Sequence, residues 1–249
     1  MSPDKSLPIG LTSSSSGNDT AVIICNGPSL ASVPNAWLDK YPTFGANRVF
    51  LKYNPDVLTT LDIKMVHNRQ LADEMLGAFP LSKEVFLSTD AYNRMGEPDL
   101  PDNVTILPKW ANVIDDDGNL IGAFSSDPME TLVSGGTVTY GMFQLARWKG
   151  FSKLLVVGLN HTFRDPRGDH FDSTYNSDVQ IPYERENVVE GEFASEVGRW
   201  YWSEEVFRAK TDFFYGVANE IFRREGGQII NCTPDTTCDV FEIDDWRNY

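Results

Sequence analysis

The sequence of 249 residues contains 36 acidic and 21 basic side chains, which gives a formal net charge of −15. Such a charge argues against binding to nucleic acid or an anionic membrane through a basic face, and the 41% hydrophobic and 12% aromatic content excludes wholesale disorder. Three cysteines without a CxxC pair fit a reducing cytoplasm, and no apolar run is long enough to span a membrane. We therefore expect a cytoplasmic protein without a nucleic-acid partner or a membrane span, and the sequence leaves its oligomeric state open.

Apolar runs separated by turn signals predict the first half of a parallel sheet. Residues 1–19 are polar and rich in serine, which predicts a flexible leader before a single domain at residues 20–249. The run Ala21-Val22-Ile23-Ile24-Cys25 is typical of a strand that is covered on both faces. The same reasoning predicts strands at residues 44–50, 57–61, 85–88 and 104–107, and a short helix at residues 68–76.

The second half of the chain contains the best-defined unit of the sequence. A turn of small residues at 134–137 opens a helix with apolar residues at helical spacing, and residues 154–158 form a buried strand. A long amphipathic helix at residues 203–225 and a strand at residues 228–231 follow. This alternation predicts the α/β fold class, with a Rossmann-like, mostly parallel sheet that is flanked by helices.

Two turns of small residues lie where such a sheet binds ligands. Ligands of doubly wound sheets sit at the carboxyl ends of the strands, where the free N–H groups of a helix N-terminus favour phosphate. Each turn could equally be an ordinary packing turn, so the pair is a stronger argument than either one. The residues are Asn26, Gly27, Pro28 and Ser29 after the first strand, where the serine could cap a helix, and Ser134, Gly135 and Gly136 before the second helix.

Two histidines are candidates for acid–base chemistry. Residues 161–200 lack periodicity, and so long an irregular stretch predicts a lid or binding segment. His161 directly follows Asn160 at the end of the apolar strand, and His170 lies in the irregular stretch with an aspartate on either side. A histidine near carboxylates can serve as a general base or stabilise phosphate, although a solvated loop histidine is the plainer interpretation.

Charged residues offer two further candidates. Arg164 and Arg167 are the basic residues best placed to contact a phosphate in this loop, unless they simply face water. The run Asp115-Asp116-Asp117 could hold Mg²⁺, but the Gly-Asn that follows favours a solvated hairpin turn.

Four segments together resemble the MptE-like family, named for archaeal 6-hydroxymethylpterin diphosphokinases. The same opening motif occurs in motility-associated flagellin glycosyltransferases and in small bacterial CMP-sialic-acid-dependent sialyltransferases. The first two segments read AVIICNGPSL at residues 21–30 and FGANRVF at residues 44–50. The third runs from SGGT at residue 134 to VGLN at residue 160, and the last reads IINCTP at residue 229 with DVF at residue 239. Their order and spacing span nearly the whole chain.

The resemblance implies a Rossmann-like transferase that binds an activated nucleotide. In the sialyltransferases the asparagines of the first two motifs hold the nucleotide, which here means Asn26 and Asn47. The serine-glycine turn lines the same site, and Asn160 at the end of the third segment is a further candidate for nucleotide binding. A histidine after the central strand takes the acceptor proton, with His170 the best match and His161 the alternative. Tyrosines from the lid offset the charge of the leaving phosphate, which makes Tyr175 and Tyr183 candidates. The resemblance implies no metal cofactor for this branch.

Three functions remain open at this level. The first is a glycosyltransferase that moves a sugar, of which a sialic-acid-like sugar is one candidate, from a nucleotide-activated donor to a glycan or protein acceptor. The second is an MptE-like diphosphokinase that transfers pyrophosphate from ATP to 6-hydroxymethylpterin, which would need Mg²⁺. That branch carries closely spaced aspartates after the third strand, where this chain has only Asp62, although Asp56 or Asp115 could contribute from other loops. The third is a non-catalytic nucleotide-binding protein.

Overall fold

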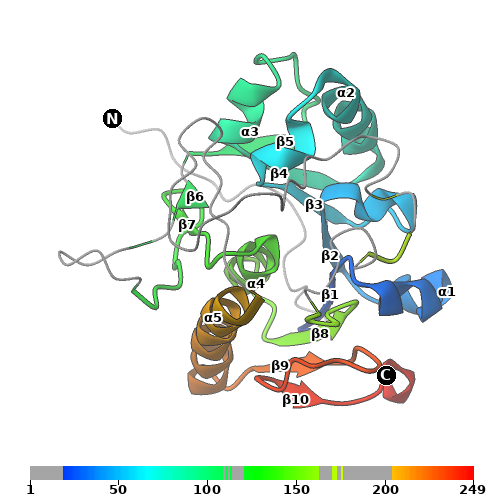
Figure 1. The fold of residues 1–249 in the computed structure, drawn as a ribbon, viewed down its shortest axis with the longest axis vertical. Helices are drawn as coiled ribbons and strands as arrows, with labels where there is room; N and C mark the ends of the chain where they lie inside the picture. Colours follow the sequence, from blue (N-terminus) through cyan, green and yellow to red (C-terminus); the bar gives the residue numbers. More distant parts are fainter. Residues whose placement is uncertain are drawn as a thin grey trace.

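The alternating apolar segments fold into an eight-stranded sheet whose paired strands all run parallel (Figure 1). The computed structural model describes residues 19–108, 110–111, 113, 121–162, 170–172, 175 and 204–249. The strand order is β10-β9-β8-β1-β2-β3-β4-β5. Their bounds are β1 (Thr20–Ile24), β2 (Thr43–Ala46), β3 (Val57–Thr60), β4 (Glu84–Ser88), β5 (Val104–Leu107), β8 (Lys153–Val157), β9 (Gln228–Asn231) and β10 (Glu242–Ile243).

The strand order reverses beside β1. From β1 the chain moves outward through β2 to β5, then returns to form β8 on the other side of β1 and continues to β9 and β10. Ile24 at the end of β1 is in register with Gly45 of β2 and with Val157 of β8. In open parallel sheets, ligands bind outside the carboxyl ends of the strands at such a switch point.

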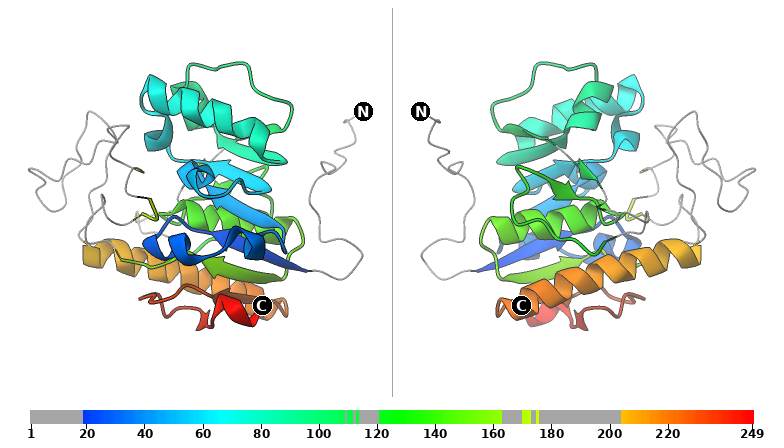
Figure 2. Two further views of the ribbon diagram at one scale, coloured as in Figure 1. Left: turned by 90° about the vertical axis from the view of Figure 1, so that its right-hand side faces the viewer. Right: turned by 90° about the vertical axis from the view of Figure 1, so that its left-hand side faces the viewer.

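Helices cover both faces of the sheet, which explains the continuous apolar runs of the strands. Along β1, Ala21 and Ile23 belong to one core cluster, whereas Val22 and Ile24 belong to the other. Helices α4 and α5 cover the first face, and α1, α2 and α3 cover the second (Figure 2). The helix bounds are α1 (Asn35–Leu38), α2 (Arg69–Ala78), α3 (Thr89–Arg94), α4 (Val138–Trp148) and α5 (Glu204–Arg224).

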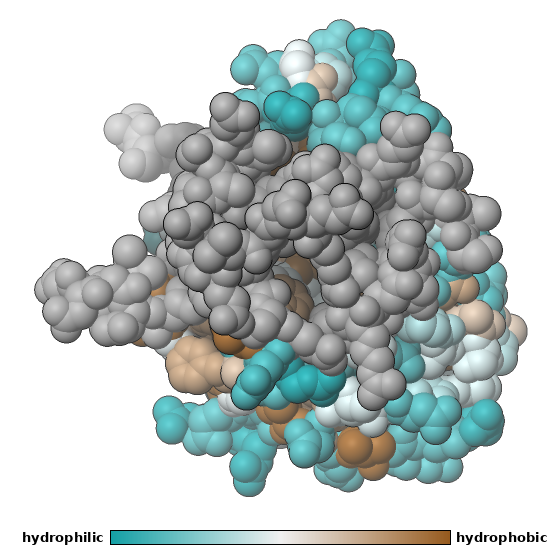
Figure 3. All heavy atoms as spheres, viewed as in Figure 1, coloured by the Kyte–Doolittle hydropathy of each residue, from teal (hydrophilic) through white to brown (hydrophobic). Residues whose placement is uncertain are grey.

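Short elements complete the described part of the chain. A second, two-stranded parallel sheet pairs β6 (Trp110–Ala111) with β7 (Leu132–Val133). The 3₁₀ helices are η1 (Pro28–Ser32), η2 (Asn47–Leu51), η3 (Ile63–Val66), η4 (Phe79–Leu81) and η5 (Trp246–Asn248). The described residues visible in Figure 3 are mostly hydrophilic, in keeping with the net charge of −15. No helix in the described ranges is long and apolar enough to cross a membrane.

The α/β fold prediction is confirmed, and one predicted strand is wrong in its second half. The segment predicted as a strand at residues 44–50 ends as a strand at Ala46, because Asn47 has a φ of +56° that leaves the extended region and starts η2. The predicted leader lies outside the described residues except for Asp19, whose carbonyl accepts hydrogen bonds from Ser152 and Lys153. The predicted lid at residues 161–200 is described only at residues 161–162, 170–172 and 175.

Candidate functional site

The loops that follow β1 and β8 cross at the switch point with their backbones in contact. The Gly27 amide donates a hydrogen bond of 2.8 Å to the Gly158 carbonyl. A Cβ at Gly27 would come within 2.4 Å of that carbonyl oxygen, and a Cβ at Gly158, where φ is +73°, would come within 2.2 Å of the Cys25 carbonyl oxygen. Both glycines are therefore required for this crossing, which forms the floor of the site.

Ser29 and Asn160 bind each other across this crossing. The Asn160 Oδ1 accepts hydrogen bonds from the Ser29 amide at 3.0 Å and from the Ser29 hydroxyl at 2.7 Å. Its Nδ2 lies 3.5 Å from the Pro234 carbonyl, so this side chain joins the ends of β1, β8 and β9. The expectation that Ser29 caps the following helix is wrong, because Gly27 occupies the cap position of η1 and Ser29 follows the exposed Pro28 inside it. That these residues contact a nucleotide stays a prediction.

Two asparagines place side-chain oxygens at the ends of β1 and β2. The Asn26 Nδ2 donates to the Ala46 carbonyl at 3.2 Å, which turns its Oδ1 away from that carbonyl. Within the described ranges, Oδ1 of Asn26 and Oδ1 of Asn47 are buried and have no hydrogen-bond partner. A buried acceptor without a donor costs about 1–3 kcal/mol. The two oxygens therefore indicate a ligand that brings hydrogen-bond donors to this edge of the sheet.

The serine-glycine turn forms the N-terminus of α4. Gly135 and Gly136 have φ values of +55° and +82°, and the Ser134 hydroxyl accepts a hydrogen bond of 3.2 Å from the Gly136 amide. Lys210 of α5 lies against this turn, since a Cβ at Gly136 would be 3.1 Å from its Cε and 3.5 Å from its Nζ. Burial lowers the pKa of Lys210. The sequence did not single out this lysine, which brings a basic group to the N-terminus of an eleven-residue helix.

His170 lies over the end of β1 with its protonation state defined by its surroundings. Its Nδ1 contacts the Asn26 carbonyl at 3.3 Å and its ring stacks on Tyr175 with centroids 3.9 Å apart. Burial lowers the pKa of His170 to about 4, and the nearby Arg48 charge lowers it further, against the effect of the Asn26 contact. Because a carbonyl only accepts, Nδ1 carries the proton and the neutral ring has its lone pair on Nε2.

A buried arginine that the sequence did not single out fixes the position of Tyr175. Arg48 is 2% exposed and pairs through Nε and Nη2 with the two carboxylate oxygens of Glu74, both at 3.0 Å. Its Nη1 donates to the Tyr175 carbonyl, and its amide lies 3.4 Å from the Tyr175 hydroxyl. Tyr175, predicted to offset phosphate charge, thus contacts an arginine that is already paired. Its hydroxyl lies beside the start of η2 at the end of β2.

His161 forms a pair with an aspartate of α5. Its Nε2 lies 2.7 Å from the Asp212 Oδ1, and its side chain is 1% exposed. Burial lowers the pKa of His161, whereas the Asp212 carboxylate acts in the opposite direction. Asp212 lies one helical turn after Arg208, so in the sequence it resembles a surface ion pair. Only the packing of α5 against the end of β8 brings the carboxylate to His161.

The same aspartate and histidine adjoin Cys238. In the described ranges, one ligand atom from each of the three side chains lies within 4.8 Å of the others, which is a set that zinc accepts. The separation of 2.7 Å between His161 and Asp212 is that of a hydrogen bond. Two ligands of a tetrahedral Zn²⁺ at 2.0–2.2 Å would stand roughly 3.4 Å apart. The geometry therefore fits a hydrogen-bonded pair better than a metal site.

The structure does not describe all of the predicted site residues. Arg164, Arg167 and Tyr183 lie outside the described residues, and so do Asp115, Asp116 and Asp117. Asp62 follows β3 and caps η3, where its Oδ1 accepts a hydrogen bond of 2.9 Å from the Lys64 amide.

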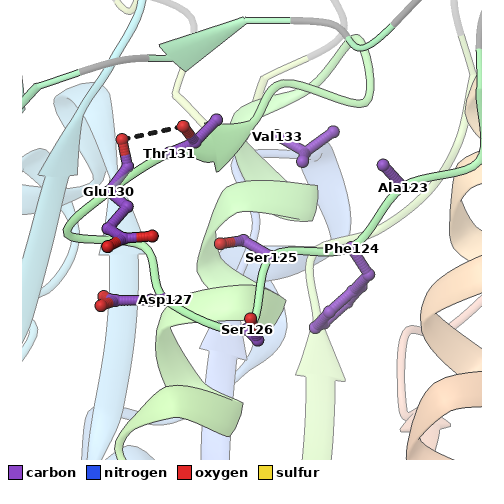
Figure 4. Close-up of a pocket in the computed structure, with 8 residues that line it drawn as sticks. All are labelled: Ala123, Phe124, Ser125, Ser126, Asp127, Glu130, Thr131 and Val133. Carbon is purple, nitrogen blue, oxygen red and sulfur yellow. Dashed lines mark hydrogen bonds between the residues drawn. The ribbon is translucent and has the colours of Figure 1, made fainter.

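A small hollow lies beside α4, away from this crossing (Figure 4). Its volume is about 280 Å³, and the carboxylates of Asp127 and Glu130 lie on one side of it. The amides of Ser125 and Val133 both donate to Gln144 Oε1, which places the hollow along the side of α4 rather than at its N-terminus. The candidate site is therefore the crossing at the switch point.

Comparison with known proteins adds no match: no family model, no curated protein and no solved structure matches this chain. The candidate site therefore rests on three observations from the described residues. These are the sheet topology, the crossing of the β1 and β8 loops, and the acceptors and histidines gathered around that crossing.

Proposed function

We propose that this protein is a glycosyltransferase that binds a nucleotide-activated sugar at the switch point and transfers the sugar to a glycan or protein acceptor. The observation that carries the proposal is the pair of buried oxygens on Asn26 and Asn47, at the carboxyl ends of β1 and β2, that have no hydrogen-bond partner among the described residues. Ribose hydroxyls and the amino group of a base are donors that such oxygens accept. Their place at the switch point of a parallel sheet supports a nucleotide as the ligand.

The proposal places the phosphate of the donor at the N-terminus of α4, where the Thr139 hydroxyl lies 3.5 Å from the Cys25 thiol after β1. The turn of Ser134, Gly135 and Gly136 opens α4, and a helix N-terminus with glycines admits a phosphate to its free amides. Lys210 lies against the same turn and supplies positive charge there. This arrangement lets a protein with a net charge of −15 bind an anionic ligand through a local field.

The proposed reaction is a single displacement at the anomeric carbon. The oxygen of the acceptor hydroxyl bonds to that carbon, and the bond from the carbon to the phosphate oxygen breaks. The nucleoside phosphate leaves with the electron pair, and a histidine, either His161 or His170, takes the acceptor proton. The scheme requires no metal cofactor. A sialic-acid-like sugar on a cytidine monophosphate is the donor that the family resemblance favours.

Two other functions compete with this one. A diphosphokinase acting on ATP and a pterin would need carboxylates for Mg²⁺, and Asp62 is a single carboxylate whose Oδ1 already caps η3. A non-catalytic nucleotide-binding protein would use the same asparagines without turnover. The spacing around Asp62 favours glycosyl transfer over the diphosphokinase, and only an assay of transfer separates it from simple binding.

Thermal-shift measurements with CMP, CDP, GDP, UDP and ATP, each with and without Mg²⁺, test the proposal. We expect stabilisation by CMP in metal-free buffer and a smaller shift in the Asn47→Gly variant, which keeps the positive φ but lacks the amide. An assay that measures the passage of sugar from the nucleotide sugar of the stabilising nucleotide to an acceptor then tests transfer. Stabilisation only by ATP with Mg²⁺ would favour the diphosphokinase, and stabilisation without transfer would favour the binding protein.

A further inference from the structure

The two histidines at the crossing are held in different ways, and the difference bears on which of them takes the proton. His170 contacts a neutral backbone carbonyl through its Nδ1, whereas His161 is hydrogen-bonded to a carboxylate. On the basis of the proposed function, we propose that His161 accepts the proton of the acceptor hydroxyl and that Asp212 of α5 is its positioning residue.

His161 has a backbone conformation that residues other than glycine rarely adopt. Its φ is +60°, and a non-glycine residue persists in that region only where its surroundings enforce it. The Thr237 hydroxyl donates to the His161 carbonyl at 2.9 Å, and the Thr236 hydroxyl donates to the Leu159 carbonyl at 2.7 Å. The loop after β9 therefore clamps the loop after β8 and keeps the imidazole at the edge of the sheet.

Asp212 determines which ring nitrogen is basic. Because the carboxylate only accepts, the contact of 2.7 Å places the proton of the neutral ring on Nε2 and its lone pair on Nδ1. When Nδ1 takes up a proton, the adjacent carboxylate stabilises the imidazolium that forms. The aspartate thus orients the ring, selects the tautomer and offsets the charge of the protonated state.

Other charges around His161 come from the two elements that pack against it. On α5, Arg208 opposes protonation of the ring and Asp212 favours it, and on the loop after β9 the exposed Asp239 also favours it. Tyr215 of α5, with its ring centroid 5.8 Å from that of the histidine, and the buried thiol of Cys238 complete the surroundings. Burial is the largest of these effects and lowers the pKa of His161 on balance, and the Asp212 carboxylate is the strongest group that acts against it and favours the imidazolium.

His170 has the weaker support for this role. Burial lowers the pKa of both histidines, to about 4 for His170. Among the described contacts, His161 has a carboxylate at hydrogen-bond distance, whereas His170 contacts the Asn26 carbonyl and lies near the Arg48 charge, which disfavours a protonated ring. In the proposed step the hydroxyl proton passes to Nδ1 of His161 as its oxygen bonds to the anomeric carbon. The nucleoside phosphate leaves with the electron pair of the broken bond, and the imidazolium later returns its proton to solvent.

The first test is nuclear magnetic resonance of the ring nitrogens, which needs no substrate. The chain has only three histidines, so a ¹⁵N-labelled sample shows three ring systems, and His161→Gln assigns the one of interest. We expect the Nε2–H tautomer for His161 and a lower titration midpoint in Asp212→Asn. Asp239→Asn removes a nearby carboxylate from an exposed position and should shift the midpoint less. An unchanged tautomer and midpoint in Asp212→Asn would overturn the pairing.

The second test measures transfer with the nucleotide sugar whose nucleotide stabilises the protein. We expect Asp212→Asn to lower kcat by about 10²-fold with little change in the donor KM, because a misplaced base affects the chemical step. Its pH profile should move together with the titration midpoint of His161, and Asp212→Glu should restore part of the rate. His170→Gln should lower kcat less than His161→Gln does.

The outcomes separate this inference from the proposed function. Transfer by the wild type with an unchanged kcat and pH profile in Asp212→Asn would overturn the role of Asp212 and leave the glycosyltransferase standing. A larger loss in His170→Gln than in His161→Gln would make His170 the base. Absence of any transfer by the wild type would overturn both, even where the resonance spectra show the pair.

Discussion

Replacing Gly158 with alanine tests the crossing of the β1 and β8 loops. The residue has a φ of +73°, and its new Cβ would lie 2.2 Å from the Cys25 carbonyl oxygen, which is a backbone atom that cannot rotate away. The left-handed conformation costs an L-residue roughly 1–2 kcal/mol. Separating the two loops adds about 1–3 kcal/mol, as overpacking does in cores. We therefore expect Gly158→Ala to lower the free energy of unfolding by about 2–5 kcal/mol.

The assay is urea unfolding followed by circular dichroism, with Gly77→Ala as the matched control. Gly77 is an exposed residue of α2, and a Cβ there meets no atom within 4 Å. The same substitution should stabilise the protein at that position by about 0.5–1 kcal/mol, because alanine has the higher helix propensity. If Gly158→Ala unfolded at the same urea concentration as the wild type, the loops would not cross as described.

Two further predictions concern groups around Tyr175. Arg48→Met should lower the free energy of unfolding by about 3 kcal/mol, since it leaves the largely buried Glu74 without its cation. The control Arg69→Met breaks an exposed ion pair and should lower it by less than about 0.5 kcal/mol in the same urea titration. Burial lowers the pKa of His170 from 6.5 to about 4 in the folded protein. Between these two pH values the unfolded chain therefore binds a proton at this residue that the folded chain does not. Stability from this group should therefore be lost as the pH falls from 6.5 to about 4, and His170→Gln should show a smaller loss between pH 7 and 4.5; an equal loss would contradict the lowered pKa.

Much of the fold could be predicted because parallel strands buried on both faces are continuous apolar runs. The predicted strands at residues 57–61, 154–158 and 228–231 match β3, β8 and β9 to within a residue at either end. The strand predicted at residues 44–50 was too long, because its apolar residues beyond Asn47 belong to a 3₁₀ helix entered through a positive φ. Short elements such as α1 and β10 carry too few residues to show a period.

Only the part of the site that lies close to the ends of the strands could be predicted from the sequence. Asn26, Asn47 and His161 lie within four residues of the ends of β1, β2 and β8, and parallel strands bring their carboxyl ends to one edge. Asp212 and Lys210 reach the site because α5 packs across that edge, and these contacts between segments more than fifty residues apart left no local signal. Arg48, in turn, looked like part of a strand and is instead the buried partner of Glu74.

The most direct test of the proposed nucleotide site is isothermal titration calorimetry with CMP in metal-free buffer, on the wild type and on Asn47→Gly. The two asparagine oxygens, for which the described part of the chain offers no hydrogen-bond donor, predict that the wild type binds CMP. Loss of one of them should weaken binding by about 0.5–1.5 kcal/mol, which is roughly a two- to tenfold rise in Kd. The control variant Gly77→Ala should bind CMP as the wild type does, because Gly77 belongs to α2 and not to the loops of the crossing. No binding by the wild type, or equal binding by Asn47→Gly, would contradict a nucleotide site at the switch point.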